Sequence, residues 1–199
     1  MESFGALMFD DAVQAEQERQ GTRAQNERLA ARVRFAQIGP DEQTFIETRT
    51  TAYLATNGAD GWPYVQHRGG PSGFIKVLGP DEIAFAEYPG NRQFITLGRL
   101  GEDARVSLIL MDYPQRARLK LLGTAEITKD SELLGALTLP EGVTATRALR
   151  IKIAALDWNC PKYITRRFTE HEIAHLVGPE LQRLQDRIAA LEAELAART

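Results

Sequence analysis

The 199-residue sequence contains little of what marks several classes of protein. A single cysteine, Cys160, excludes an internal disulfide framework and is typical of a reducing compartment, so we expect a cytoplasmic protein. No apolar run approaches the ~20 residues that cross a bilayer, and the first ten residues lack the basic start and apolar stretch of a signal peptide. A net charge of −3 disfavours nucleic acid as the main partner. We therefore expect neither a membrane nor a nucleic-acid partner.

The residue types that build metal and nucleophilic sites are also scarce. Of the three histidines, His171 and His175 stand four residues apart, but they do not complete an HExxH pattern and no third ligand is evident. Cys160 precedes a proline, and no His-Asp pair is placed to activate it. The sequence therefore predicts no metal site and no residue that we can assign as catalytic. If the protein is an enzyme, a bound cofactor supplies the chemistry.

The middle of the chain reads as a series of strands separated by short turns. The segments with strand composition or alternation are 51–56, 62–68, 74–78, 83–86, 105–111, 118–127 and 147–156. One helix, over 94–100, crosses between the fourth and fifth strands, and Gly123 marks a bend or bulge in the sixth. The pattern predicts a mainly β (α+β) protein with a closed or nearly closed antiparallel barrel of six or seven strands.

Helices are predicted on both sides of the barrel, which gives an N-terminal helical arm (1–38), a barrel domain (39–157) and a C-terminal loop with helices (158–199). Gly39-Pro40 begins a helix that ends near Arg49, and a small helix follows over 131–137. Thr169 and Glu172 form a capping box, and Pro179 starts a last helix. That helix carries an a/d seam of Leu181, Leu184, Ile188, Leu191 and Leu195. The seam packs either on the chain's own barrel or against a second chain in a two-stranded coil.

The stretch from Phe85 to Gln93 is the strongest candidate for a binding site. An apolar strand leads into Pro89-Gly90, where we expect a sharp turn, and Asn91 stands where a helix N-cap is expected. Free backbone N–H groups, the helix dipole and the guanidinium of Arg92 would then converge, which suits a phosphate or another anion. The alternative is an ordinary strand-to-helix connection with a solvated arginine.

Further polar residues precede a glycine-rich loop at the end of the second strand. Gln66 and Arg68 share one face of that strand, and His67 takes the other. Together with Lys76, Asn91 and Arg92 they predict a cationic cleft for an anionic ligand. Trp158 either stacks on a planar ligand or plugs one end of the barrel.

These motifs, taken in order, resemble the pyridoxamine 5′-phosphate oxidase-related, FMN-binding split-barrel family. The resemblance covers residues 45–155 and rests on the segments 51–56, 61–70, 85–93 and 103–108. It implies a split barrel, an FMN cofactor and a homodimer with two flavins at its interface.

In the family, an arginine and a lysine on early strands and a Ser-Arg-Lys turn hold the FMN phosphate. By resemblance, Lys76 stands at the strand lysine, Arg68 replaces the strand arginine, and Asn91 and Arg92 match the Ser-Arg pair. Gln93 replaces the lysine of the turn, and Arg118 stands near a glutamine that contacts the flavin from the second subunit. The cofactor-binding residues expected are Gln66, His67, Arg68, Lys76, Glu87, Tyr88, Asn91, Arg92, Arg118, Trp158 and Asn159.

The C-terminal segment departs from the family pattern. Members that oxidise pyridoxamine phosphate end in a segment with Trp and Arg-Leu-x-Pro, whereas this chain has Trp158-Asn159-Cys160-Pro161 and then a helix. We therefore expect an FMN-dependent oxidoreductase that passes hydride between flavin and another small organic substrate. One alternative is a non-catalytic module for flavin, deazaflavin or haem, with His67, His171 or His175 as the haem ligand. Another is an interaction protein that works through its end helices.

Overall fold

The computed structural model describes residues 3–32, 37–137, 139–158 and 160–198. The chain forms two compact units, and each is described by itself. The first unit comprises Met1–Asp112 and Ala117–Pro161, and the second comprises Tyr113–Arg116 and Lys162–Thr199.

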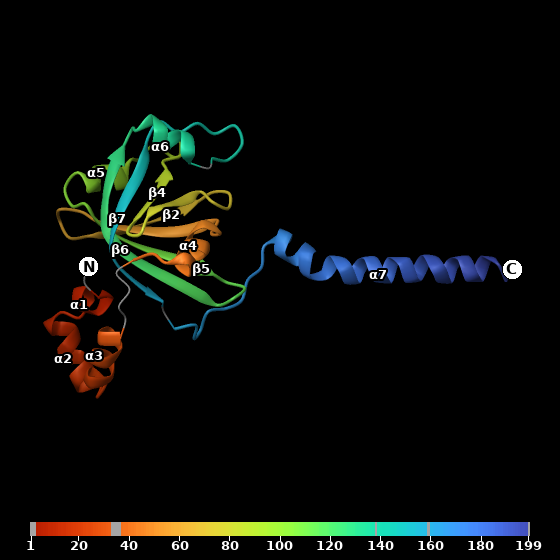
Figure 1. Ribbon diagram of the computed structural model, residues 1–199, viewed down its shortest axis with the longest axis horizontal. Helices are drawn as coiled ribbons and strands as arrows, with labels where there is room; N and C mark the ends of the chain where they lie inside the picture. Colours follow the sequence, from red (N-terminus) through yellow and green to blue (C-terminus); the bar gives the residue numbers. More distant parts are fainter. Residues whose placement is uncertain (1–2, 33–36, 138, 159, 199) are drawn as a thin grey trace. The chain divides into compact units, whose positions relative to one another are not determined.

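The first unit is built on one seven-stranded sheet in which every described neighbour pair is antiparallel. The strands are β1 (Thr51–Asn57), β2 (Pro63–Gly69), β3 (Ile75–Gly79), β4 (Glu82–Ala86), β5 (Arg105–Asp112), β6 (Ala117–Thr128) and β7 (Ala148–Trp158). Their order across the sheet is β2-β1-β5-β6-β7-β4-β3. Figure 1 draws these strands as arrows, coloured along the sequence from orange to cyan. The predicted segments are therefore confirmed as strands, with small differences at their ends.

The two edges of the sheet must approach each other because consecutive strands occupy them. In a flat sheet, β2 and β3 would lie roughly 29 Å apart, six strand spacings of about 4.8 Å. The chain from Gly69 to Ile75 spans roughly 21 Å even when fully extended. The sheet therefore curls into a barrel, but the described strand ladders do not join β2 to β3. The barrel is split rather than closed, as the family resemblance implies.

The inner face of the curled sheet forms the main core. Its fully buried side chains include Leu54, Leu108, Leu110, Leu119 and Leu121, which are at most 1% exposed. Gly123 permits the tight packing of β6 on β7, because a Cβ there would lie 2.3 Å from the carbonyl oxygen of Lys152. The strand register shifts between Leu122 and Gly123, which confirms the predicted bulge.

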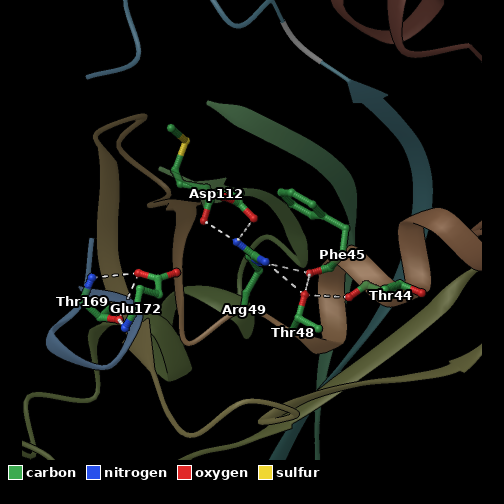
Figure 2. Close-up of polar contacts among 8 residues, drawn as sticks. Thr44, Phe45, Thr48, Arg49, Asp112, Thr169 and Glu172 are labelled. Atoms are coloured by element: carbon green, nitrogen blue, oxygen red, sulfur yellow. Dashed lines mark hydrogen bonds and ion pairs between the residues drawn. The ribbon is translucent and has the colours of Figure 1, made fainter. Parts of the chain in front are cut away.

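Helix α4 (Pro40–Glu47) packs on β3 and is fixed at both ends. Near its start, the carboxylate of Glu42 accepts hydrogen bonds from the Gly39 N–H at 3.1 Å and from the Trp158 indole N–H at 2.7 Å. Beyond its end, Arg49 Nη1 lies 2.7 Å from Asp112 Oδ2 of β5, and Figure 2 shows the guanidinium between Asp112 and the end of the helix. These contacts fasten α4 to the strands at one end of the barrel.

Shorter helices complete the first unit. The N-terminal part contains α1 (Phe4–Met8), α2 (Asp11–Arg19) and α3 (Arg23–Arg32). Two more lie between strands: α5 (Ile95–Leu100) and α6 (Ser131–Ala136). A second, smaller cluster joins Leu133 and Leu137 of the α6 region to Ala84 of β4.

The second unit is dominated by α7 (Glu170–Ala196), a helix of 27 residues. The predicted capping box is present, since the Thr169 hydroxyl accepts from the Glu172 N–H at 3.2 Å and the Glu172 carboxylate accepts from the Thr169 N–H at 2.7 Å (Figure 2). Pro179 lies inside this helix, so the prediction that it starts a separate helix is wrong. A proline removes one backbone hydrogen bond, which can bend a helix without ending it. Among the described helices, none combines the length and apolar content needed to span a bilayer.

Candidate functional site

A cavity of about 420 Å³ lies in the barrel unit beside β2, the segment after β4 and the start of α5. Its volume falls within the range typical of small-molecule sites. The lining residues are Tyr64, Gln66, Arg68, Glu87, Tyr88, Pro89, Gly90, Asn91, Arg92, Gln93, Phe94, Ile95, Thr96, Leu97, Thr144, Thr146 and Arg147. Three of them are arginines and one is a carboxylate, so the described lining carries a formal charge of +2.

Arg68 is the most deeply buried cation of this cavity. Its side chain is 10% exposed, and its Nη1 atom donates to Oε2 of Glu87 at 2.9 Å. Its guanidinium also lies over the ring of Phe85, with 6.0 Å between the Cζ atom and the ring centroid. The Nε and Nη2 atoms are buried without a hydrogen-bond partner among the described residues. Buried guanidinium donors are costly to leave unpaired, which favours an additional acceptor at this position.

Two further arginines reach the cavity from separate segments. Arg92 is in the loop after β4, and Arg147 directly precedes β7, where its backbone carbonyl accepts from the Glu87 N–H at 3.0 Å. The Arg147 guanidinium lies 5.6 Å from the ring centroid of Phe94. The antiparallel pairing of β4 with β7 brings this arginine beside the loop, because Ala86 lies opposite Ala148.

The loop that carries Arg92 has an unusual backbone. Arg92 and Phe94 have φ angles of 59° and 54°, in the left-handed region that non-glycine residues seldom occupy. Each such residue costs about 1–2 kcal/mol. Strain of this kind gathers at ligand-binding segments, and here it falls on two residues that line the cavity.

The Gln66 amide has a defined orientation in the same cavity. The buried hydroxyl of Thr96 donates to Gln66 Oε1 at 2.7 Å. With its oxygen engaged in this way, Gln66 offers its Nε2 hydrogens to a ligand.

Tyr88 contributes a neutral phenol to the lining. Burial raises the pKa of the Tyr88 phenol above its ordinary value of 10.0, so the group stays protonated at neutral pH. Gly70 lets the chain pass close to this ring, because a Cβ at Gly70 would lie 2.8 Å from the Tyr88 hydroxyl and 2.6 Å from Cβ of Phe74.

The predicted role of Asn91 as a helix N-cap is wrong. Helix α5 begins at Ile95, its N-cap is Phe94, and no side chain caps it. Asn91 Oδ1 instead accepts from the Gln93 N–H at 3.1 Å, which closes a local turn. This hydrogen bond uses the oxygen that would otherwise cap a helix. At six residues α5 is too short for its dipole to define an anion site, so any anion here depends on the arginine side chains.

The structure brings six of the predicted residues to the cavity: Gln66, Arg68, Glu87, Tyr88, Asn91 and Arg92. His67 lies on the outer face of β2, as its position in the strand predicts, with its ring 5.8 Å from that of Tyr53. Lys76 also lies apart from the described lining. It pairs with Ala84 across the β3–β4 ladder, whereas Phe85, beside Arg68, points to the other face. The expected convergence of Lys76 with Arg68 and Arg92 is therefore not observed in this chain.

The remaining predicted residues occupy other places. Arg118 is on the outer face of β6, since the buried residue after it, Leu119, points into the core, and its Nε atom is buried without a partner among the described residues. Trp158 packs edge-on against Phe45 with centroids 4.7 Å apart and is 39% exposed, away from the described cavity lining. Asn159 lies outside the described residues.

Sequence reasoning missed Arg147 together with Tyr64, Phe94, Thr96 and the two threonines Thr144 and Thr146. Arg147 reads in sequence as one of several basic residues in an alternating strand. Its place at the cavity follows from the register of β4 against β7, which short-range patterns do not contain.

These residues fit a phosphate-bearing flavin. Phosphate oxygens suit the unpaired donors of Arg68 and the guanidinium groups of Arg92 and Arg147. Tyr64, Tyr88 and Phe94 supply aromatic surface of the kind that accompanies planar ligands, and Gln66 supplies amide donors.

The fold and this cavity define a split-barrel protein with a cationic cavity. The sequence matches the family described as pyridoxamine 5′-phosphate oxidase over residues 38–159, and the chain belongs to this family. A comparison with curated protein sequences finds no match.

Solved structures of similar fold align with part of the chain. HupZ of Group A Streptococcus is 13% identical, with 66% of this chain and 99% of that chain covered and a TM-score of 0.49. A Clostridium acetobutylicum protein related to general stress protein 26, of the pyridoxinephosphate oxidase family, is 18% identical. The alignment covers 67% of this chain and 94% of that protein's chain, with a TM-score of 0.45. The family assignment rests on the sequence match.

Proposed function

We propose that this chain is an FMN-binding flavoprotein that serves as an oxidoreductase for a small organic substrate. The observation that carries the proposal is the meeting of three arginines in one cavity, one of them buried with two unpaired nitrogen atoms. Membership of the pyridoxamine 5′-phosphate oxidase family supports a flavin as the ligand.

In this proposal Arg68, Arg92 and Arg147 hold the phosphate, and Gln66 donates hydrogen bonds to the polar edge of the ring. Glu87 orients Arg68 through their ion pair and offsets part of the positive charge. The bound flavin supplies hydride transfer to or from an organic substrate. The described cavity lining includes no histidine, so haem would lack an axial ligand from these residues and is the weaker alternative.

A homodimer completes the proposal. Arg118 faces away from the cavity of its own chain and has an unpaired buried Nε atom. The same outer face of the sheet carries apolar side chains farther away, such as Val65 on β2, three strands from β6, which is 61% exposed. A second subunit on this face would pair Arg118 and cover Val65. Sedimentation of Val65→Asp, with the exposed Ile127→Asp as control, tests this face, and an unchanged dimer in both variants argues against it.

The test of cofactor binding is a fluorescence titration of the apoprotein with FMN. Loss of one charge-assisted contact of about 1.5–3 kcal/mol predicts that Arg92→Ala weakens FMN binding by roughly ten- to hundredfold. Arg105→Ala, an exposed arginine outside the cavity lining, serves as the matched control and leaves the affinity unchanged. Equal affinities for all three proteins, or no binding by any, would refute the proposed site.

Turnover requires a separate measurement. Anaerobic mixing of the FMN-loaded protein with NADH or NADPH, followed by flavin absorbance, reports reduction of the cofactor. A bound flavin that no reductant of this kind and no organic acceptor can turn over would limit the protein to cofactor carriage.

A further inference from the structure

The apolar stripe of α7 is exposed along its whole length. Its members have exposed fractions between 46% and 67%, and no residue of the helix is buried. The stripe consists of Leu181, Leu184, Ile188, Leu191 and Leu195. A continuous apolar strip on a 27-residue helix implies a partner for that face, because helices in proteins gain most of their stability by packing an apolar face against a partner.

The choice of residues along the stripe favours a second copy of the same helix. The spacing alternates three and four, so Leu184 and Leu191 occupy d positions, and Ile188 occupies the a position between them. Leu181 and Leu195 occupy the other a positions, so Ile188 is the one β-branched residue at a in the seam. A β-branched residue at a with leucine at d favours two parallel strands. Pro179 falls at the outward f position just before the seam, where its missing N–H does not face the partner.

The flanking charges separate a parallel from an antiparallel pair. In a parallel coil, Arg187 at g lies opposite Glu192 at e of the other helix, and the symmetry makes this attractive contact twice. An antiparallel alignment that pairs Leu181 with Leu191 places the two Arg187 side chains opposite each other and Glu180 opposite Glu194. Like charges in such positions are unfavourable, so the flanking charges favour the parallel arrangement over this antiparallel alignment.

The overall charge of the helix argues against an anionic lipid surface as its partner. Six acidic residues against two arginines give α7 a formal charge of −4. Such a helix is repelled by anionic lipid surfaces, which attract basic amphipathic helices.

We propose that α7 pairs with α7 of a second copy of this chain as a parallel, in-register coiled coil over residues 181–195. This contact does not depend on flavin binding, and it adds to any contact between the barrels. Two heptads form a weak coil as an isolated peptide, so the tests use the full chain.

Cysteine cross-linking tests the register directly. In a Cys160→Ser background, Leu191→Cys places one thiol at a d position, where it meets its own copy only in a parallel coil. Mild copper-catalysed oxidation should convert most of this variant into a reducible covalent dimer. Ala193→Cys, at the outward f position, is the matched control and should cross-link only at background level.

Equal cross-linking of both variants, or none for Leu191→Cys, would overturn the proposal. Cross-linking of Leu191→Cys to a Leu181→Cys chain, without Leu191→Cys homodimers, would show an antiparallel pair and also overturn it.

A second readout does not depend on thiol geometry. Ile188→Asp puts a carboxylate into the seam, and it should raise the dimer dissociation constant roughly tenfold or more by sedimentation. Ala189→Asp adds the same charge one residue away at an outward b position, and it should leave the constant unchanged. Identical constants for both variants would contradict a seam at Ile188.

Discussion

The barrel and α7 use the same aliphatic residues in opposite ways. In the sheet, leucines such as Leu108 and Leu121 are at most 1% exposed, because neighbouring strands and the opposite wall of the barrel cover them. In α7, Leu184 and Leu191 are each 46% exposed. The barrel therefore finds its apolar partners within the chain, whereas the α7 stripe requires a partner from outside its own helix.

This difference separates the tasks of the two units. Burial in the barrel stabilises a scaffold on which Arg68, Arg92 and Arg147 meet, although they lie on three distant segments. The described core of that scaffold is formed by residues of the barrel unit, and the α7 stripe belongs to the other unit. Substitutions of one residue type should therefore have different consequences in the two regions.

The largest effect is expected from truncation of a core leucine. Leu121→Ala removes a side chain with no exposure, and it should lower the free energy of unfolding by about 3 kcal/mol. Leu184→Ala should change the free energy of barrel unfolding by less than about 0.5 kcal/mol while weakening the dimer. Urea denaturation followed by fluorescence of Trp62 and Trp158 measures both. Equal losses would mean that α7 packs on its own barrel.

The buried ion pair should give the next largest effect. Arg68→Met leaves Glu87, whose side chain is 15% exposed in the pair, without its arginine, at an expected cost of about 2–3 kcal/mol of unfolding free energy. The double variant Arg68→Met, Glu87→Gln should regain most of that stability because no uncompensated charge remains. It should not regain FMN affinity. Recovery of both properties would show that Arg68 serves only to balance Glu87.

A smaller effect should follow from filling the close contact between β6 and β7. Gly123→Ala places a methyl group 2.3 Å from the Lys152 carbonyl oxygen, and it should cost about 1–3 kcal/mol of unfolding free energy. Gly135→Ala in α6 meets no atom within 4 Å and should be neutral or stabilising by about 0.5–1 kcal/mol. Thermal denaturation of the two variants makes the comparison, and a tolerated Gly123→Ala would contradict the close approach of the strands.

The smallest effect is expected at the surface pair of Asp103 and Arg105. The side-chain hydrogen bond from Arg105 lowers the pKa of Asp103 from 3.8 to about 2. A lowered native pKa adds stability above the unfolded value, and this stability is lost as the pH falls from about 4 through about 2. Asp103→Asn should therefore alter the pH dependence of unfolding only in that acidic window. Added salt should shrink the difference further, and an equal effect that persists in high salt would contradict a surface pair.

Much of the barrel could be predicted from short-range patterns. Alternating side chains and glycine-rich turns gave all seven strands, and Gly123 indicated its own bulge. The capping box of Thr169 and Glu172 was equally local. In these cases the physical cause lies within a few residues, so the sequence contains it.

The site was less predictable because its residues meet through strand register. Arg147 reaches the cavity because Ala86 pairs with Ala148, and Lys76 leaves it because it points to the face opposite Phe85. Asn91 was predicted to cap a helix, but its Oδ1 atom accepts from the Gln93 N–H in a local turn. Both roles use the same oxygen, so the sequence alone does not distinguish them. Pro179 was predicted to start a helix, but α7 continues through it because the residues before and after it are both helical.

The central claim is that the three arginines of the barrel cavity hold a phosphate. Calorimetric titration of the apoprotein with FMN and with riboflavin, which lacks the phosphate, tests it most directly. We predict that FMN binds at least about a hundredfold more tightly, the equivalent of two charge-assisted hydrogen bonds, and that Arg92→Ala removes part of this preference. Equal affinity for the two flavins, or binding of neither, would contradict the account.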